Sequence, residues 1–257
     1  MWMFKKPVVE FRYLIPNMQT IMPIIKAKHY KHAWAKRARA NITELMRNDP
    51  DLFKERFMHI TKCVGIRGIM QRGWIVRSWM DIVIETANNG TDVKWFSPLD
   101  QREFLPRRDA VSFHAPEQLT DFYDNWPDDA LRMLIKINTP WAVKLPRGYS
   151  MLLMPVAYAD EKRFTVMSGL ITSNLPASPI NVQMRWHVKE GKELIEAGTP
   201  LAQLILIKDD DIEATQVYRN DDDMLFGSYL PFNNRFSRMY NAIKEMASND
   251  WPYTKEK

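Results

Sequence analysis

The chain contains little cysteine and no long apolar segment. Cys63 is the single cysteine among 257 residues, so neither an internal disulfide nor a zinc site built from several cysteines can form. No uncharged apolar run approaches the roughly 20 residues that a membrane-spanning helix needs. We therefore expect a reducing cytoplasm as the compartment and no membrane partner. Cys63 itself is expected to be buried as filler beside Val64 and Ile66.

Motifs for cofactor chemistry are also missing. The sequence has nine glycines, but it shows no Gly-x-Gly-x-x-Gly element, no P-loop and no serine nucleophile elbow. An iron-dependent oxygenase with His114, Asp109 and His187 as ligands is a hypothesis that lacks the usual His-x-Asp spacing. The sequence therefore predicts no cofactor, no resident metal and no catalytic residue that a motif defines.

Positive charge is concentrated near the N-terminus, although the net charge of the whole chain is only +5. Residues 26–39 contain no acid and six cations, which are Lys26, Lys28, Lys31, Lys36, Arg37 and Arg39. Such a run is either a solvated face or a surface for nucleic acid or an acidic partner chain. The aspartates at 209–211 and 221–223 lack the alternating spacing of a calcium loop, and we expect them to be solvated.

Apolar content is high enough for a sizeable core. Hydrophobic residues make up 46% of the chain, with nine Trp, nine Tyr and twelve Phe among them. Alternation and β-branched or aromatic content predict strands at residues 7–14, 74–85, 92–96 and 133–137, with a hairpin turn at Asn-Asn-Gly, residues 88–90. Helical spacing predicts helices at 28–47 and 235–247, and residues 97–116 are expected to be irregular.

These patterns predict a mainly β fold that is α+β overall. We expect three parts: an N-terminal strand and basic helical segment at 1–59, a β-rich core domain at 60–215, and an acidic loop with a C-terminal helix at 216–257.

Several turn and strand elements carry a family resemblance. Leu-Pro-Arg-Gly-Tyr at 145–149 separates two strand-like runs, and Gly-Thr-Pro-Leu-Ala-Gln-Leu at 198–204 leads into another. Gly-Leu-Ile at 169–171 and Ile-Asn-Val at 180–182 lie between them, in the order of the trimeric dUTPase superfamily, which this part of the chain resembles. The resemblance implies a dUTPase-like (β-clip) barrel or jelly roll. It also suggests a trimer, in which neighbouring subunits cover edge strands.

The chain departs from that family where the family performs its chemistry. The resemblance puts a catalytic aspartate directly after Gly-Leu-Ile, but Thr172 stands there, and a hydroxyl cannot serve as general base near neutral pH. An Arg-Ser-Gly phosphate turn should follow Pro155, but the chain reads Val-Ala-Tyr at 156–158. The residues that the resemblance leaves as ligand-binding are Asp81, Gly148, Tyr149 and Gln203, and Asp160 is a second carboxylate to test beside Asp81.

The chain as a whole also resembles an uncharacterised family of bacteriophage proteins. This resemblance implies a phage origin, with the host cytoplasm or the virion as location. Together with the missing carboxylate, it predicts a non-enzymatic binding or assembly factor or a virion structural component. Self-association or other phage proteins are the expected partners, and nucleic acid is a further one through the basic N-terminal segment. The alternative is a nucleotide-binding protein or a diverged nucleotide hydrolase.

Overall fold

The structure is a computed structural model, and it describes residues 7–49, 60, 63–99, 109–120 and 128–215. The chain divides into two compact units. The first combines Met1–Tyr30 with Met70–Asp210, and the second combines Lys31–Ile69 with Asp211–Lys257. The strands belong to the first unit, which carries the mainly β character expected from the sequence.

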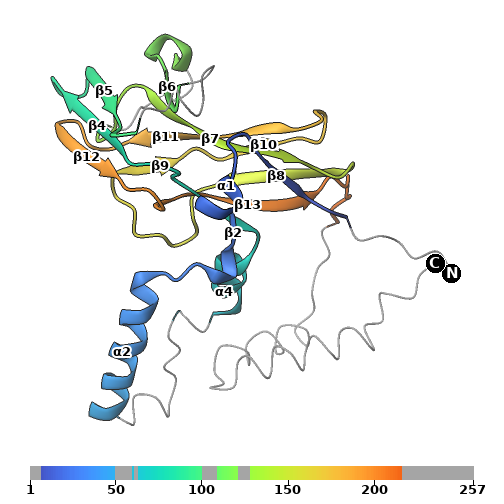
Figure 1. The fold of residues 1–257 in the computed structure, drawn as a ribbon. Helices are drawn as coiled ribbons and strands as arrows, with labels where there is room; N and C mark the ends of the chain where they lie inside the picture. Colours follow the sequence, from blue (N-terminus) through green and yellow to red (C-terminus); the bar gives the residue numbers. More distant parts are fainter. Residues whose placement is uncertain (1–6, 50–59, 61–62, 100–108, 121–127, 216–257) are drawn as a thin grey trace. The chain divides into compact units, whose positions relative to one another are not determined.

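The first unit contains three antiparallel sheets, as Figure 1 shows. The first sheet joins β1 (Glu10–Tyr13), β7 (Leu134–Lys144), β11 (Ser178–Trp186) and β9 (Phe164–Val166) in that order, with β6 (Val111–His114) also paired to β7. The second sheet runs β10 (Gly169–Ile171), β8 (Tyr149–Met154), β13 (Pro200–Lys208), β3 (Trp74–Arg77) and β2 (Ile25–Lys26). The third runs β12 (Gly191–Ile195), β4 (Ile82–Ala87) and β5 (Asp92–Phe96).

The inner faces of the three sheets share one hydrophobic core. Buried and half-buried residues alternate along all nine positions of β11, as expected for a strand with one face in the core. Fully buried side chains come from every sheet, including Ile135, Met184, Met151, Leu204 and Ile82. Because each such side chain contributes about 1.5–3 kcal/mol when removed from water, this cluster is the main source of stability. The described strand pairings form open sheets, so the expected barrel closure stays a prediction.

The hairpin predicted between residues 82 and 96 is confirmed, but the strand before it is divided. Asn88, Asn89 and Gly90 have φ angles of 54°, 54° and 82°, which produces the tight turn between β4 and β5. The single strand expected at 74–85 is wrong, because β3 and β4 lie in different sheets. Between them, the Ser78 N–H donates to the Thr199 carbonyl, and the Ser78 carbonyl accepts from Gly198 N–H. These bonds draw the chain out of the second sheet.

Strand β7 continues well past the predicted residues 133–137, through Pro140 to Lys144. Proline cannot donate a ladder hydrogen bond, so it is normally confined to edges or irregularities. Here the register of β11 shifts between Pro179 and Asn181, and the Thr139 hydroxyl donates to the Ile180 carbonyl at 2.6 Å. The side chain therefore satisfies a carbonyl that lies at the break in the ladder.

The helices differ more from the sequence predictions. The helix expected at 28–47 is α2 (Ala33–Asn48), which is preceded by the short η1 (Ala27–His29) and an extended His32. Residues 64–71 form α4 (Val64–Gln71) although Gly65 and Gly68 lie within it. Strand β6 lies in the segment expected to be irregular. Two further short helices in the described residues are α1 (Met18–Ile21) and η4 (Pro116–Leu119).

Two further expectations concern exposure and the C-terminus. The prediction that Cys63 is buried is wrong, because its side chain is exposed. The predicted helix at 235–247 and the rest of 216–257 lie outside the described residues. No helix in the described ranges combines the length and the apolar character that crossing a bilayer demands.

Candidate functional site

The four predicted ligand-binding residues lie at different points, and three of them lie in or beside the second sheet. Tyr149 opens β8 opposite Lys208, whereas Gln203 on β13 lies opposite Met154 at the far end of the same strand. Five residues of strand separate these ends, about 17 Å at 3.4 Å per residue. Gly148 has a φ of 74° in the preceding turn, and its carbonyl accepts from Asp209 N–H at 2.8 Å. Gly148 and Tyr149 therefore lie far from Gln203.

The buried side chain of Gln203 connects three segments of the chain by hydrogen bonds. Its side chain is 1% exposed. Its Oε1 accepts from the Ala157 N–H at 3.0 Å, and its Nε2 donates to the Arg72 carbonyl at 2.7 Å. A buried amide that meets both a donor and an acceptor recovers what it loses by leaving water. Gln203 thus ties β13 to the turn after β8 and to the segment before β3, and we call this arrangement the Gln203 joint.

The turn after β8 is the place where the resemblance puts a phosphate turn. Val156 and Ala157 are buried, and Ala159 N–H donates to the Val156 carbonyl at 3.1 Å to close the turn. Tyr158 has a φ of 58°, a left-handed conformation that costs a residue other than glycine about 1–2 kcal/mol. Phosphate cradles use free backbone N–H groups, but the N–H of Ala157 is already given to Gln203.

Asp81 lies just before β4, between the second and third sheets. Its Oδ1 accepts from the Ala197 N–H at 2.7 Å, in the turn that leads to β13. Ser78, which is fully buried, donates its hydroxyl to the Met80 carbonyl at 2.7 Å in the same connection. The carboxylate is therefore engaged in holding the turn that contains Gly198. Asp160, the second carboxylate to test, is exposed in the turn between β8 and β9.

The Gly-Leu-Ile element forms a strand, β10, as the resemblance implies, but the catalytic carboxylate expected after it is missing. Its residues 169–171 pair with residues 153–151 of β8, so the Gly-Leu-Ile element forms a strand at the edge of the second sheet. The next residues are Thr172, Ser173 and Asn174, and none of them is a carboxylate.

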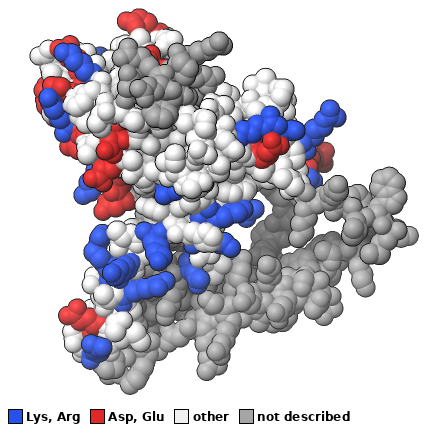
Figure 2. All heavy atoms as spheres, in the orientation of Figure 1, with Lys and Arg blue, Asp and Glu red and all other residues white. Residues whose placement is uncertain are grey.

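The basic run belongs to both units and is described in two parts. In the first unit, Lys26 lies over the Trp74 ring at 4.1 Å from its centroid, and Lys28 is exposed. In the second unit, four exposed cations lie on or before the start of α2: Lys31, Lys36, Arg37 and Arg39. The first acid after them is Glu44. Figure 2 shows basic side chains gathered where α2 begins.

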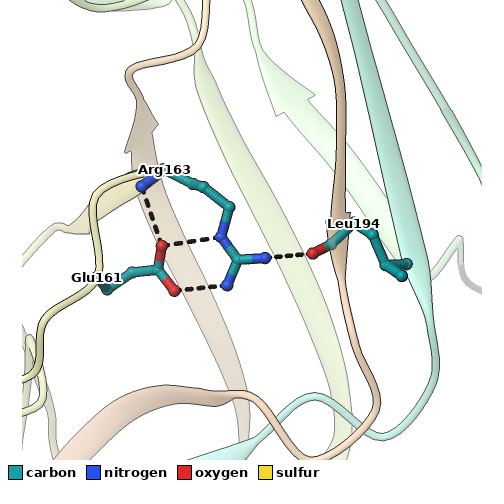
Figure 3. A network of polar contacts seen from close by, with 3 residues as sticks. All are labelled: Glu161, Arg163 and Leu194. Atoms are coloured by element: carbon teal, nitrogen blue, oxygen red, sulfur yellow. Dashed lines mark hydrogen bonds and ion pairs between the residues drawn. The ribbon is translucent and has the colours of Figure 1, made fainter.

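An ion pair between Glu161 and Arg163, which the sequence did not predict, lies just before β9, and its arginine also contacts β12. Arg163 donates from Nε to Glu161 Oε1 at 2.9 Å and from Nη2 to Oε2 at 2.6 Å, and Nη1 contacts the Leu194 carbonyl (Figure 3). Burial raises the pKa of Glu161, but the hydrogen bonds and charge of Arg163 outweigh it, so the net pKa shift is downward. The spacing Glu-Lys-Arg was its only sequence signal.

The structure does not assemble the iron ligands of the oxygenase hypothesis. His187 Nε2 lies 2.7 Å from the Thr165 hydroxyl, and its Nδ1 lies 4.0 Å from Asp129. His114 ends β6, opposite Leu134. Across the residues that the structure describes, no three His, Cys, Asp or Glu side chains form a group that could hold a metal.

Comparison with known proteins gives a likeness in fold only. No family model and no curated protein matches the chain. The chain is similar to a mutant dUTPase from phage phi11 of S. aureus, at 12% identity over 82% of this chain and 97% of that chain, with a TM-score of 0.35. It is similar to the native EIAV dUTPase at 10% identity over 65% of this chain and 92% of that one, with a TM-score of 0.30.

A third similar structure is a mutant dUTPase from Staphylococcus bacteriophage 80alpha. It is 13% identical over 65% of this chain and 82% of that chain, with a TM-score of 0.31. No residue role is transferred at such identities, and the chemistry of the site depends on the residues described above. What the chain shares with these dUTPases is a mainly β scaffold.

Proposed function

We propose that this protein is a non-enzymatic bacteriophage protein, a binding or assembly factor or a virion component, built on a dUTPase-like β scaffold. One observation carries the proposal: the Ala157 N–H, in the turn where a phosphate would be cradled, is donated to the buried Gln203. A group that already has a buried partner is not free for a substrate without breaking the Gln203 joint. The turn at residues 156–158, where the resemblance puts a phosphate, therefore stabilises the fold through the bond from Ala157 to Gln203.

The neighbouring chemistry supports the same conclusion. Thr172 follows β10 where a general base would be needed. A hydroxyl stays protonated near neutral pH because its pKa is far too high, so it cannot serve as that base. The Asp81 carboxylate accepts from Ala197 N–H and so holds a turn. Residues 156–158 add no cation to neutralise a triphosphate.

Binding or assembly would use surfaces outside this position. In the second unit, the four cations at the start of α2 suit nucleic acid or an acidic protein of the same phage. In the first unit, β10 is a short edge strand and Leu170 on it is 62% exposed, which favours self-association at this edge. We place such assembly in the host cytoplasm or the virion.

The test is a pyrophosphate-release assay with dUTP and the other deoxynucleoside triphosphates, with and without Mg²⁺, alongside a thermal-shift screen. We expect no turnover above the blank and no shift in melting temperature. A ligand at a hundred times its dissociation constant would stabilise the protein by about 2.7 kcal/mol, which such a screen detects readily. Turnover that disappears in Asp81→Asn would overturn the proposal.

A nucleotide-binding or diverged hydrolytic role is the second candidate. It is favoured by the contact of Asp81 with the Ala197–Gly198 turn, because this contact joins two elements of the resemblance. If this role is correct, dUTP will raise the melting temperature of the wild-type chain but not of Asp81→Asn. Asp160→Asn is the matched control, since Asp160 is exposed in a different turn.

A further inference from the structure

Helix α2 of the second unit has a basic side that is open to solvent. Lys36, Arg37, Arg39 and Arg47 lie on it, and all four side chains are exposed. The ion pairs between described residues involve none of these four cations. Glu44 is the one acid in the sequence of α2, so the helix carries an excess of positive charge. We call the four basic residues the α2 cations.

The α2 cations are spread around the helix. Consecutive residues of an α-helix are turned by about 100°, which puts Arg37 and Arg39 about 160° apart around the axis, with Lys36 between them. Arg47 lies about three turns beyond Lys36 and in line with it, about 16 Å along the axis. Two cations therefore lie on opposite flanks of α2, and two lie along the middle of its basic side.

Short side chains separate the two cations in the middle of the basic side. Ala40 and Thr43 occupy the intervening turns in line with Lys36, and both are exposed. The Thr43 hydroxyl donates to the Arg39 carbonyl at 2.9 Å, which keeps this side chain against the helix. A partner can therefore approach the helix backbone closely along this line, with cations on both flanks of the contact.

The other side of α2 is apolar and partly covered along its first half. Trp34, Ala38 and Ile42 recur there at helical spacing, and each is half-buried. A helix that lies on an anionic membrane inserts its apolar side into the lipid. Because this apolar side is already partly covered, the α2 cations favour a polyanion in solution over a membrane surface.

We propose that α2 binds duplex DNA by lying in its major groove. A helix about 10–12 Å wide fits a groove about 12 Å wide, whose walls carry the phosphates of the two strands. Arg37 and Arg39 would each contact the phosphates of one wall, with Lys36 and Arg47 over the base edges. An acidic protein surface presents its carboxylates from one side and does not match cations on opposite flanks. This inference rests on the proposed function and names the partner of its basic surface.

The experiment is fluorescence anisotropy of the full chain with a labelled DNA duplex at several salt concentrations. We expect the affinity to fall steeply with salt, because phosphate contacts release counterions. Arg37→Gln and Arg39→Gln should each weaken binding at least about fivefold near 0.1 M salt and flatten the slope of log K against log salt concentration by about 0.9. Lys94→Gln is the matched control, because it removes an exposed cation from β5 in the first unit.

The helix should survive these substitutions, since glutamine and arginine have similar helix propensities, and circular dichroism checks this. If Arg37→Gln or Arg39→Gln leaves the affinity and the slope unchanged, α2 contacts at most one wall and the proposal is wrong. It is also wrong if the duplex does not bind, or if Lys94→Gln weakens binding as much as they do.

Other polyanions test the groove itself. Duplex RNA of the same sequence should bind at least about tenfold more weakly, because its major groove is too deep and narrow to admit the helix. Equal binding of duplex RNA or of single-stranded DNA would overturn the proposal. Polyglutamate that displaces the duplex at equal charge concentration would overturn it in favour of an acidic protein.

The outcomes separate this inference from the proposed function. Turnover of a deoxynucleoside triphosphate would refute the non-enzymatic function, whereas DNA binding by α2 is measured without any nucleotide substrate. Absence of DNA binding together with absence of turnover would refute this inference alone.

Discussion

Two parts of the first unit treat buried amide side chains in opposite ways. In the Gln203 joint, a side chain that is 1% exposed has both a donor and an acceptor within 3.0 Å. On β11, the buried Oδ1 of Asn181 has no hydrogen-bond partner among the described residues. A satisfied amide stabilises the fold, whereas an unsatisfied buried amide lowers its stability. The comparison separates a buried amide that supports the fold from one that costs it stability.

The largest loss of stability is expected from adding a side chain at Gly73, which lies against the backbone of Leu204 next to the Gln203 joint. A Cβ at Gly73 would lie 1.8 Å from the Leu204 carbonyl oxygen, which is backbone and cannot move aside. We expect Gly73→Ala to destabilise the protein by at least about 3 kcal/mol in urea unfolding, or to prevent folding. Gly148→Ala is the control, because its φ of 74° is similar but its space is open, and about 1 kcal/mol is expected. Equal costs would mean that backbone conformation, not the close approach, decides.

The next effect comes from removing the joint itself. Gln203→Ala should cost about 2–3 kcal/mol in urea unfolding, because it leaves the Ala157 N–H and the Arg72 carbonyl without their partner. The same substitution at Gln183, on the half-buried side of β11, should stay within about 0.5 kcal/mol. If the two variants unfold at the same urea concentration, the contrast between the regions is wrong.

A smaller effect of opposite sign is expected at Asn181. Asn181→Leu removes an unsatisfied acceptor and fills nearly the same volume. The melting temperature should therefore stay unchanged or rise, and the free energy of unfolding should increase by up to about 1 kcal/mol. Thermal unfolding of the variant beside the wild type measures the change. A clear fall in melting temperature would show that Asn181 has a structural role instead.

The smallest effect concerns the ion pair of Glu161 and Arg163. A carboxyl whose folded pKa is below its unfolded value stabilises the fold above pH 4.5, and this contribution is lost as pH falls through the folded pKa. Because the pair is only partly buried, we expect less than about 1 kcal/mol. Unfolding from pH 7 down to pH 3 should therefore show a shallower loss of stability in Glu161→Gln than in wild type. Glu10→Gln serves as a control with an exposed pair. A steeper loss in Glu161→Gln would contradict the pKa shift.

Local patterns predicted those elements that depend on neighbouring residues. The hairpin at 88–90 follows from Asn and Gly accepting positive φ, and β5 begins and ends at the predicted residues. The division between β3 and β4 could not be predicted, because the bonds of Ser78 go to Gly198 and Thr199, about 120 residues later in the chain. Neither could the length of β7, since Pro140 is tolerated only where β11 shifts its register.

The candidate site shows the same limit. The resemblance offered Gln203 as a ligand-binding residue, but its hydrogen-bond partners lie 46 and 131 residues away in the chain. The half-buried sides of β7 and β11 gave no sequence signal, because alternating polar residues are normal on a half-buried strand. Only pairing of β6, β7, β9 and β11 puts Lys136, Gln183 and Arg185 side by side.

The sequence by itself determined the mainly β class, the absence of disulfides and the missing carboxylate after β10, because composition, alternation and residue identity do not depend on distant contacts. The tertiary structure alone decided which polar groups are satisfied. Hydrogen bonds need atoms within about 3 Å, and only the folded sheets bring segments so distant in the chain that close.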